Sequence, residues 1–155
     1  RVDRRQRQMC IRDRSNSSYE IYCKTLKPIK KISTKEFPGY PTDLQAQLIA
    51  TQLKSGLKSK VVENIFENRF IHIPELRRFG ANLSIKGNTV TIDKTSNLLG
   101  AEVMATDIRA SFSLIIAAMM SKGKTVINRI YHLDRGYEDF DLKLKKCGVN
   151  ISRKK

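Results

Sequence analysis

Apolar residues recur at helical spacing in two stretches of the chain. The first stretch carries them at Leu44, Leu48, Ile49 and Leu53. The second carries them at Ile108, Phe112, Ile115, Ile116, Met119 and Met120. A Thr-Asp pair opens each stretch, and the side-chain oxygens of such pairs can accept hydrogen bonds from the free N–H groups of a first helical turn. The pattern predicts two helices, each with one face in a core.

The same elements follow each of these predicted helices. A β-branched run, typical of a strand, comes next, at 61–66 and at 125–130. A second helix is then expected, near 70–79 and near 137–147. Gly80 and Gly148 come directly after these second helices, where glycine often ends a helix in the left-handed conformation.

Further strands complete the pattern. In the first half of the chain, 81–86 and 89–93 flank Gly87-Asn88 and predict a hairpin. Strands are also expected before the first helix of each half, near 20–23 and 102–105.

The two halves of the chain are copies of one repeat. The segment 41–46 (PTDLQA) matches 105–110 (ATDIRA) at an offset of 64 residues. Arg69 matches Arg135 at an offset of 66, so the copies differ by small loop insertions. An internal repeat of this kind indicates a fold assembled from like units.

Each copy reads strand, helix, strand, helix, strand, strand. The sequence therefore predicts an α/β fold of repeated βαβαββ units, at about 19–94 and 98–155. The second copy stops one strand short, and we expect a segment outside this chain to supply that strand.

The first residues do not belong to this pattern. Residues 1–14 read RVDRRQRQMCIRDR, with no clear period and no apolar run between the charges. They match neither a secretory signal nor a transit peptide. We expect them to be a non-native or disordered leader, and we exclude them from the fold.

The charge of the chain suggests a polyanion partner at first, since the formal net charge is +15. The leader supplies six arginines and two aspartates, and the remainder carries +11. Most of this excess is lysine scattered over predicted turns and surfaces. The sequence therefore predicts no nucleic-acid-binding stripe.

Other patterns limit the location and the chemistry. The longest apolar run, 114–120, is far shorter than the roughly 20 residues of a membrane-spanning helix, so we expect no membrane partner. The three cysteines form no C-x-x-C pair, which favours a reducing compartment and a cytoplasmic location. The two histidines lack metal-ligand spacing, so no metal site is predicted.

Arg109 stands where a cation is locally unfavourable, in the first turn of a predicted helix and close to the positive end of its dipole. A bound carboxylate or phosphate would reverse the sign, because backbone N–H groups and the guanidinium would converge on it. The alternative is a local ion pair of Arg109 with Glu102 or Asp107.

Three more residues have both a functional and a structural interpretation. Arg69 and Arg135 fall in loops between a strand and a helix, where ligands often bind, although exposed salt bridges are the more usual explanation. Asp43 is either a plain helix N-cap or a carboxylate beside cationic side chains that accepts a proton from a substrate hydroxyl. Three converging arginines would bind a multiply charged anion.

Four blocks of sequence carry a resemblance to a known family. They are 38–47 (PGYPTDLQAQ), 66–70 (FENRF) with 74–76 (PEL), 104–110 (MATDIRA) and 129–137 (RIYHLDRGY). In this order they closely resemble the UDP-N-acetylglucosamine 1-carboxyvinyltransferases, a family of enolpyruvyl transferases. The resemblance covers about 19–155, so we expect 15–155 to be the C-terminal part of such an enzyme.

The resemblance implies a two-domain inside-out α/β barrel of βαβαββ units, with the active site in the cleft between the domains. The implied reaction transfers an enolpyruvyl group from phosphoenolpyruvate to the 3-hydroxyl of UDP-N-acetylglucosamine and releases phosphate, a step of peptidoglycan synthesis. No metal or organic cofactor is implied.

The family pattern also implies roles for individual residues. Asp43 is similar to the carboxylate that contacts the sugar 3-hydroxyl and acts as the base, and Ile65 is similar to a backbone contact of the nucleotide sugar. Arg135 resembles the arginine that closes on phosphoenolpyruvate, while Arg69 and Arg109 resemble arginines that hold anionic groups. The remaining groups of such a site, a lysine, a loop cysteine and a further arginine, lie in an N-terminal part absent from this chain, so we expect no turnover by the chain alone.

Two alternatives stay open. One is an enolpyruvylshikimate-phosphate synthase-like transferase. Such enzymes share the repeat but not the amino-acid sequence of the 67–70 and 134–136 segments. The other is a basic, non-catalytic module that binds nucleic acid, suggested by the net charge.

Overall fold

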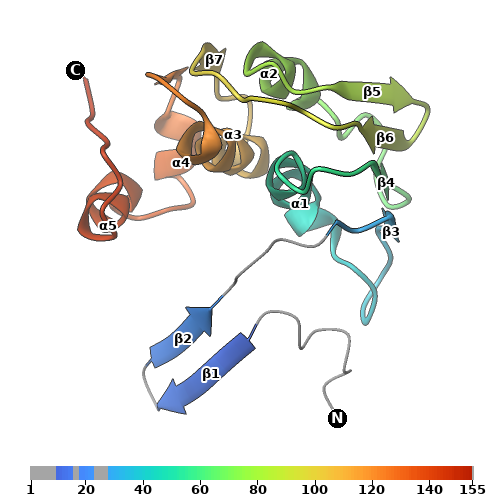
Figure 1. Ribbon diagram of the computed structural model, residues 1–155, viewed down its shortest axis with the longest axis horizontal. Coiled ribbons are helices and arrows are strands. Elements are labelled where there is room, and N and C mark those ends of the chain that lie inside the picture. Colours follow the sequence, from blue (N-terminus) through green and yellow to red (C-terminus); the bar gives the residue numbers. More distant parts are fainter. Residues whose placement is uncertain (1–9, 16–17, 23–27, 155) are drawn as a thin grey trace.

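The computed structural model describes residues 10–15, 18–22 and 28–154 (Figure 1). The first elements, β1 (Cys10–Ser15) and β2 (Ser18–Tyr22), pair antiparallel in a two-stranded sheet. Most of the predicted strand near 20–23 is thus present as β2, but its partner is β1 and not a strand of the repeat. Cys23 and residues 1–9 of the predicted leader lie outside the described residues. The boundary at residue 14 stays a prediction.

The first repeat contains a four-stranded sheet. Its strands are β3 (Lys31–Ser33), β4 (Ser59–Val62), β5 (Leu83–Lys86) and β6 (Thr89–Ile92). They lie in the order β3-β4-β6-β5, with β3 and β4 parallel and the other pairs antiparallel. The predicted hairpin is confirmed. The strand β3 was not predicted, because it is only three residues long and begins on a lysine.

The helical elements of the first repeat follow the predicted order. They are the 3-10 turn η2 (Thr42–Leu44), α1 (Gln45–Gln52) and α2 (Ile73–Arg78). The second repeat contains β7 (Glu102–Met104), α3 (Ile108–Met120), β8 (Val126–Asn128), α4 (Tyr131–Asp134) and α5 (Phe140–Lys146). The strands β7 and β8 are parallel, as β3 and β4 are. The short helix α4 was not predicted.

Several predicted elements are shorter than their sequence patterns. The β-branched run at 61–66 leaves the sheet after Val62, since the N–H groups of Ile65 and Phe66 donate to the Glu63 carboxylate and not to another strand. The run at 125–130 ends at Asn128, before a left-handed residue. The C-terminal glycines behave as predicted: Gly80 and Gly148 have φ of +82° and +87°.

One core joins the two repeats. It packs the inner face of the first sheet against α1, α2 and α3, with Ile49, Leu76, Val90 and Leu114 each 0% exposed. Burial of such a side chain stabilises the fold by about 1.5–3 kcal/mol. Helices α1 and α3 lie side by side (Figure 1), and so the first turns of two different repeats come close together.

The longest described helix is α3, with 13 residues. Within residues 10–15, 18–22 and 28–154, no helix combines the length and the apolar character that a membrane crossing requires.

Candidate functional site

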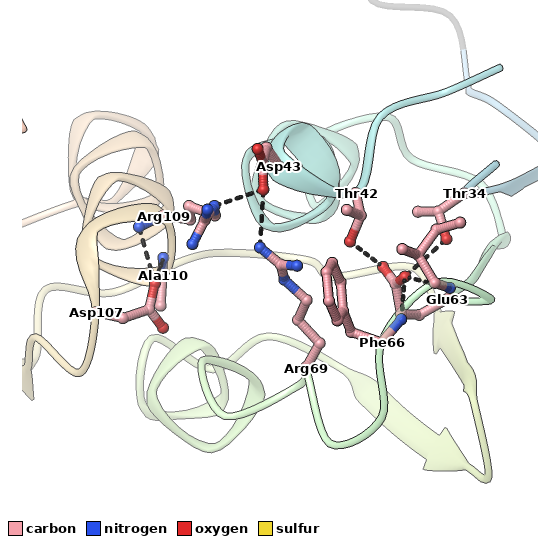
Figure 2. Close-up of polar contacts among 10 residues, drawn as sticks. Thr34, Thr42, Asp43, Glu63, Phe66, Arg69, Asp107, Arg109 and Ala110 are labelled. Atoms are coloured by element: carbon pink, nitrogen blue, oxygen red, sulfur yellow. Dashed lines mark hydrogen bonds and ion pairs between the residues drawn. The ribbon is translucent and has the colours of Figure 1, made fainter. Parts of the chain in front are cut away.

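The Asp43 carboxylate lies between two arginines (Figure 2). Its Oδ1 accepts from Nη2 of Arg69 at 2.9 Å and from Nε of Arg109 at 2.7 Å. The Asp43 side chain is 61% exposed, whereas that of Arg69 is 19% exposed. This Asp43–Arg69–Arg109 cluster is therefore open to solvent at Asp43 and at Arg109, which is 46% exposed, and is anchored by Arg69.

Three segments bring the cluster together. Asp43 comes from η2, Arg69 from the loop after β4, and Arg109 from the first turn of α3. The first two belong to the first repeat and the third to the second repeat. The packing of α1 against α3 therefore brings Asp43 and Arg109 together, because it places η2 beside the start of α3.

The two Thr-Asp pairs differ in what their carboxylates do. Asp107 is the N-cap of α3, and its Oδ1 accepts from the N–H groups of Arg109 and Ala110 at 2.9 and 3.0 Å. For Asp107 the predicted cap is confirmed. Asp43 makes no capping hydrogen bond, since neither η2 nor α1 has a side-chain cap. The cap interpretation of Asp43 is wrong, and its carboxylate faces cations instead.

The local ion pairs considered for Arg109 are absent from the described residues. Glu102 accepts from Nδ2 of Asn128, and the Asp107 carboxylate accepts from backbone N–H groups. The Arg109 guanidinium reaches across to Asp43, in the other repeat. The unfavourable location at the helix start is therefore offset by a tertiary partner.

Arg69 is held on two sides. Its guanidinium carbon lies 4.6 Å from the ring centroid of Phe66, a cation–π contact, and its Nη2 donates to Asp43. The preceding residue, Asn68, has φ of +52°, which lets the loop turn back toward the start of α1. These contacts restrict the guanidinium before any ligand binds.

Glu63 is a residue of this region that the sequence analysis missed. Its side chain is 2% exposed, and its Oε1 accepts from the Thr34 hydroxyl at 2.8 Å and from the N–H groups of Ile65 and Phe66 at 2.9 and 3.2 Å. Its Oε2 accepts from the Thr42 hydroxyl at 2.8 Å (Figure 2). Burial raises the pKa of this carboxyl, but the hydrogen bonds outweigh burial and the net shift of the pKa is downward. The only local signal was an acidic residue within the β-branched run at 61–66.

The other two predicted site residues are placed as follows. Ile65 donates its N–H to Glu63, so its backbone is fixed in the turn that leads to Arg69. Arg135 is exposed at the end of α4, and its side chain forms no hydrogen bond or ion pair within the part of the chain that the structure describes. Its neighbour Asp134 pairs with Arg153 at 2.7 Å. A substrate-binding role for Ile65 and Arg135 stays a prediction.

The cluster can do two kinds of chemistry. Two guanidinium groups against one carboxylate leave an excess of one positive charge, and a phosphate or carboxylate ligand would balance it. The carboxylate itself is exposed enough to accept a proton from a hydroxyl group of a bound ligand. The arrangement therefore suits a reaction between an anionic substrate and an alcohol.

This chain is similar to carboxyvinyltransferases, both in the family that it matches and in individual relatives. The chain matches the EPSP synthase (3-phosphoshikimate 1-carboxyvinyltransferase) family over residues 6–144. A UDP-N-acetylglucosamine 1-carboxyvinyltransferase of Rhodopseudomonas palustris (strain TIE-1) is 57% identical over 122 residues, which are 79% of this chain and 28% of the relative. The protein of the same name from Pelagibacter ubique (strain HTCC1062) is 54% identical over 136 residues, 86% of this chain and 33% of the relative.

A solved structure agrees with the sequence relatives. The enolpyruvyl transferase NikO from Streptomyces tendae superposes with a TM-score of 0.80 at 26% identity, over 94% of this chain and 34% of that protein. The chain thus spans about a third of the length of the proteins it matches. The predicted α/β enolpyruvyl transferase fold is confirmed, and the chain belongs to the EPSP synthase family of enolpyruvyl transferases.

Proposed function

We propose that this chain is part of an enzyme that transfers the enolpyruvyl group of phosphoenolpyruvate to the 3-hydroxyl of UDP-N-acetylglucosamine and releases phosphate. The observation that carries the proposal is the Asp43 carboxylate held between Arg69 and Arg109. The names of the relatives, at 54–57% identity, favour the nucleotide-sugar acceptor. In this setting the enzyme acts in the cytoplasm and feeds peptidoglycan synthesis, and hence cell-wall growth, cell shape and division.

Asp43 supplies the base. It accepts the proton of the 3-hydroxyl as the sugar oxygen bonds to C2 of phosphoenolpyruvate, while C3 gains a proton from a donor in the other part of the enzyme. Loss of a proton from C3 then expels phosphate and restores the double bond. Asp43 can accept the proton only if its carboxylate is aligned with the sugar 3-hydroxyl, and the two arginines hold the carboxylate in place.

The arginines supply charge. Arg69 and Arg109 stabilise the phosphate and carboxylate of the tetrahedral intermediate, and Arg135 is proposed to close on phosphoenolpyruvate from α4. Donors fixed before the reaction cost no reorganisation when charge develops, which is why such groups often contribute strongly to catalysis. Ile65 is proposed to contact the nucleotide sugar through its backbone.

The test uses the full-length enzyme that contains this chain. Phosphate release from phosphoenolpyruvate is measured with UDP-N-acetylglucosamine, and with shikimate 3-phosphate as the competing acceptor. We expect turnover only with the nucleotide sugar. Turnover with shikimate 3-phosphate alone supports the related synthase, and salt-sensitive nucleic-acid binding without any transfer supports the basic module. Either result overturns the proposal.

Asp43→Asn tests the named base. It removes the proton acceptor while keeping the shape, and we expect kcat to fall by roughly a hundredfold or more, the usual effect of losing a general base. Asp93→Asn is the matched control, because Asp93 is also ion-paired, with Lys58 at 3.0 Å, but lies outside the cluster. Equal activity of the two variants would exclude Asp43 as the base.

A further inference from the structure

We propose that Glu63 is the positioning residue of this site: by binding the Thr42 hydroxyl and the turn before Arg69, it keeps the Asp43 carboxylate off the helix terminus and between its two arginines. The catalytic consequence rests on the proposed function, whereas the positioning itself rests on contacts within the chain.

The internal repeat provides a comparison within one molecule. Ser33 pairs with Val62 across β3 and β4, and Met104 pairs with Asn128 across β7 and β8. The next hydrogen bond is also equivalent in the two repeats: Thr34 N–H donates to the Val62 carbonyl at 2.9 Å, and Ala105 N–H to the Asn128 carbonyl at 3.0 Å. This register makes Arg129 the counterpart of Glu63. Ala105 occupies the strand position of Thr34, and in the sequence repeat it also aligns with Pro41, because the first repeat has additional residues between β3 and η2.

The second repeat keeps the threonine, as Thr106, but lacks the other parts of the Glu63 arrangement. Ala105 has no hydroxyl to donate, and Arg129 is exposed, with its guanidinium directed to the Tyr131 hydroxyl at 2.7 Å. Thr106, the counterpart of Thr42, has a buried hydroxyl without a hydrogen-bond partner among the described residues. In the first repeat the Thr42 hydroxyl donates to Glu63 at 2.8 Å.

The two helix starts differ accordingly. In the second repeat the N-cap Asp107 is extended, with φ −154° and ψ 174°, and its carboxylate accepts from the helix N–H groups. In the first repeat residues 42–44 form a 3-10 turn, closed by Leu44 N–H donating to the Pro41 carbonyl. The two Thr-Asp pairs thus adopt different conformations. In the pair whose threonine binds Glu63, the aspartate carboxylate is free of the helix N–H groups and contacts the arginines.

Glu63 also determines the second partner of the ion pair. Its Oε1 binds the N–H groups of Ile65 and Phe66, and the Phe66 ring in turn lies against the Arg69 guanidinium. One buried carboxylate therefore fixes both the segment that carries Asp43 and the segment that carries Arg69. Glu63 has no cationic partner in the described residues, and its buried charge is stabilised by four hydrogen bonds, three of which come from the segments that carry Asp43 and Arg69.

The test is the substitution Thr42→Val in the full-length enzyme, with Thr106→Val as the matched control. Valine keeps the shape of threonine and removes only the hydroxyl. Glu63→Ala is unsuitable as the main variant, because it leaves several buried donors without an acceptor and can prevent folding. Crystal structures and steady-state kinetics are compared for the two valine variants and for Thr42→Ser.

We expect Thr42→Val to move Asp43 out of reach of Arg69 or Arg109 and to lower kcat by about tenfold, equivalent to about 1.4 kcal/mol. Thr106→Val should do neither, and Thr42→Ser should keep the Asp43 contacts and recover most of the lost kcat. Thr42→Val with both arginine contacts intact overturns the inference, as does an equal loss of kcat in Thr106→Val. If the wild-type enzyme transfers no enolpyruvyl group, the proposed function fails, while the crystal structures still decide the role of Glu63.

Discussion

The Arg109 Nε lies 2.7 Å from the Asp43 Oδ1, and this contact joins the first turns of two repeated units. Both side chains are largely exposed, at 46% and 61%. Exposed ion pairs contribute at most about 1 kcal/mol to folding, because solvent screens them. The contact is therefore better explained by the chemistry of the site than by stability.

Removing the Arg109 side chain should separate these two contributions. We expect Arg109→Ala to lower kcat of the full-length enzyme by roughly a hundredfold, since a preorganised cation is lost from the reacting centre. The free energy of unfolding should change by less than about 1 kcal/mol in urea titration. The control is Lys58→Ala, which breaks an ion pair with Asp93 of similar length and should leave kcat unchanged. A large loss of stability without loss of kcat would contradict the assignment.

Truncation of the two equivalent aspartates should cost different amounts of folding stability. Asp107→Ala removes two capping hydrogen bonds from α3 and should cost about 1 kcal/mol of stability, whereas Asp107→Asn keeps an acceptor and should cost less. Asp43→Ala removes no cap and should cost little. Urea unfolding of the chain compares the three variants. A larger cost for Asp43→Ala than for Asp107→Ala would show that this view of the helix starts is wrong.

His72 should make folding stability depend on pH. Its side chain is 1% exposed, and burial lowers the pKa to about 4, against a small opposing effect of Asp107. Between pH 4 and 6.5 the unfolded chain therefore binds the proton and the folded chain does not, so stability is complete above this window and is lost as the pH falls. From pH 7 to pH 5 we expect a loss of about 2 kcal/mol.

The variant His72→Gln isolates this effect. It cannot titrate, so its stability should be nearly flat between pH 7 and pH 5, whatever its absolute value. The lowered pKa of Glu63 acts in the same direction but only below the ordinary range of a glutamate, outside this interval. Parallel curves for the wild type and His72→Gln in urea unfolding would rule out the buried histidine as the cause.

Gly100 should tolerate no side chain. A Cβ atom at this position would lie 2.2 Å from the Lys124 carbonyl oxygen, a backbone atom that cannot move aside. We expect Gly100→Ala to lower the free energy of unfolding by about 3 kcal/mol, because the added methyl group overpacks this site. Gly56→Ala is the comparison: Gly56 has φ of +76° but nothing within 4 Å, so only backbone strain of about 1 kcal/mol opposes alanine there. Thermal unfolding should rank the two variants in that order.

Much of the fold was predictable because its signals are local. The helix at 108–120, its cap at Asp107 and the left-handed Gly80 depend on residues within a turn of one another. The three-residue strand β3 was missed because its hydrogen bonds go to β4, almost thirty residues away, and a short polar strand has no period of its own.

The residues of the candidate site also fall into those that local sequence indicated and those that depend on distant contacts. Asp43, Arg69 and Arg109 were singled out as candidate site residues, and they meet, while the place of Arg135 in the site stays a prediction. The cap interpretation of Asp43 failed, because the Thr-Asp pair of each repeat allows two conformations and local sequence does not choose between them. Glu63 was missed because its four partners come from three separate segments.

By itself the sequence determined the repeat, the helices, the glycines that end them, and the family to which the chain belongs. These features depend on the spacing of residues and on short sequence motifs along the chain. Only the tertiary structure decided which carboxylate caps a helix and which one meets the arginines. That choice depends on the packing of α1 against α3 and on a buried glutamate behind the first helix start, and both are contacts between residues far apart in sequence.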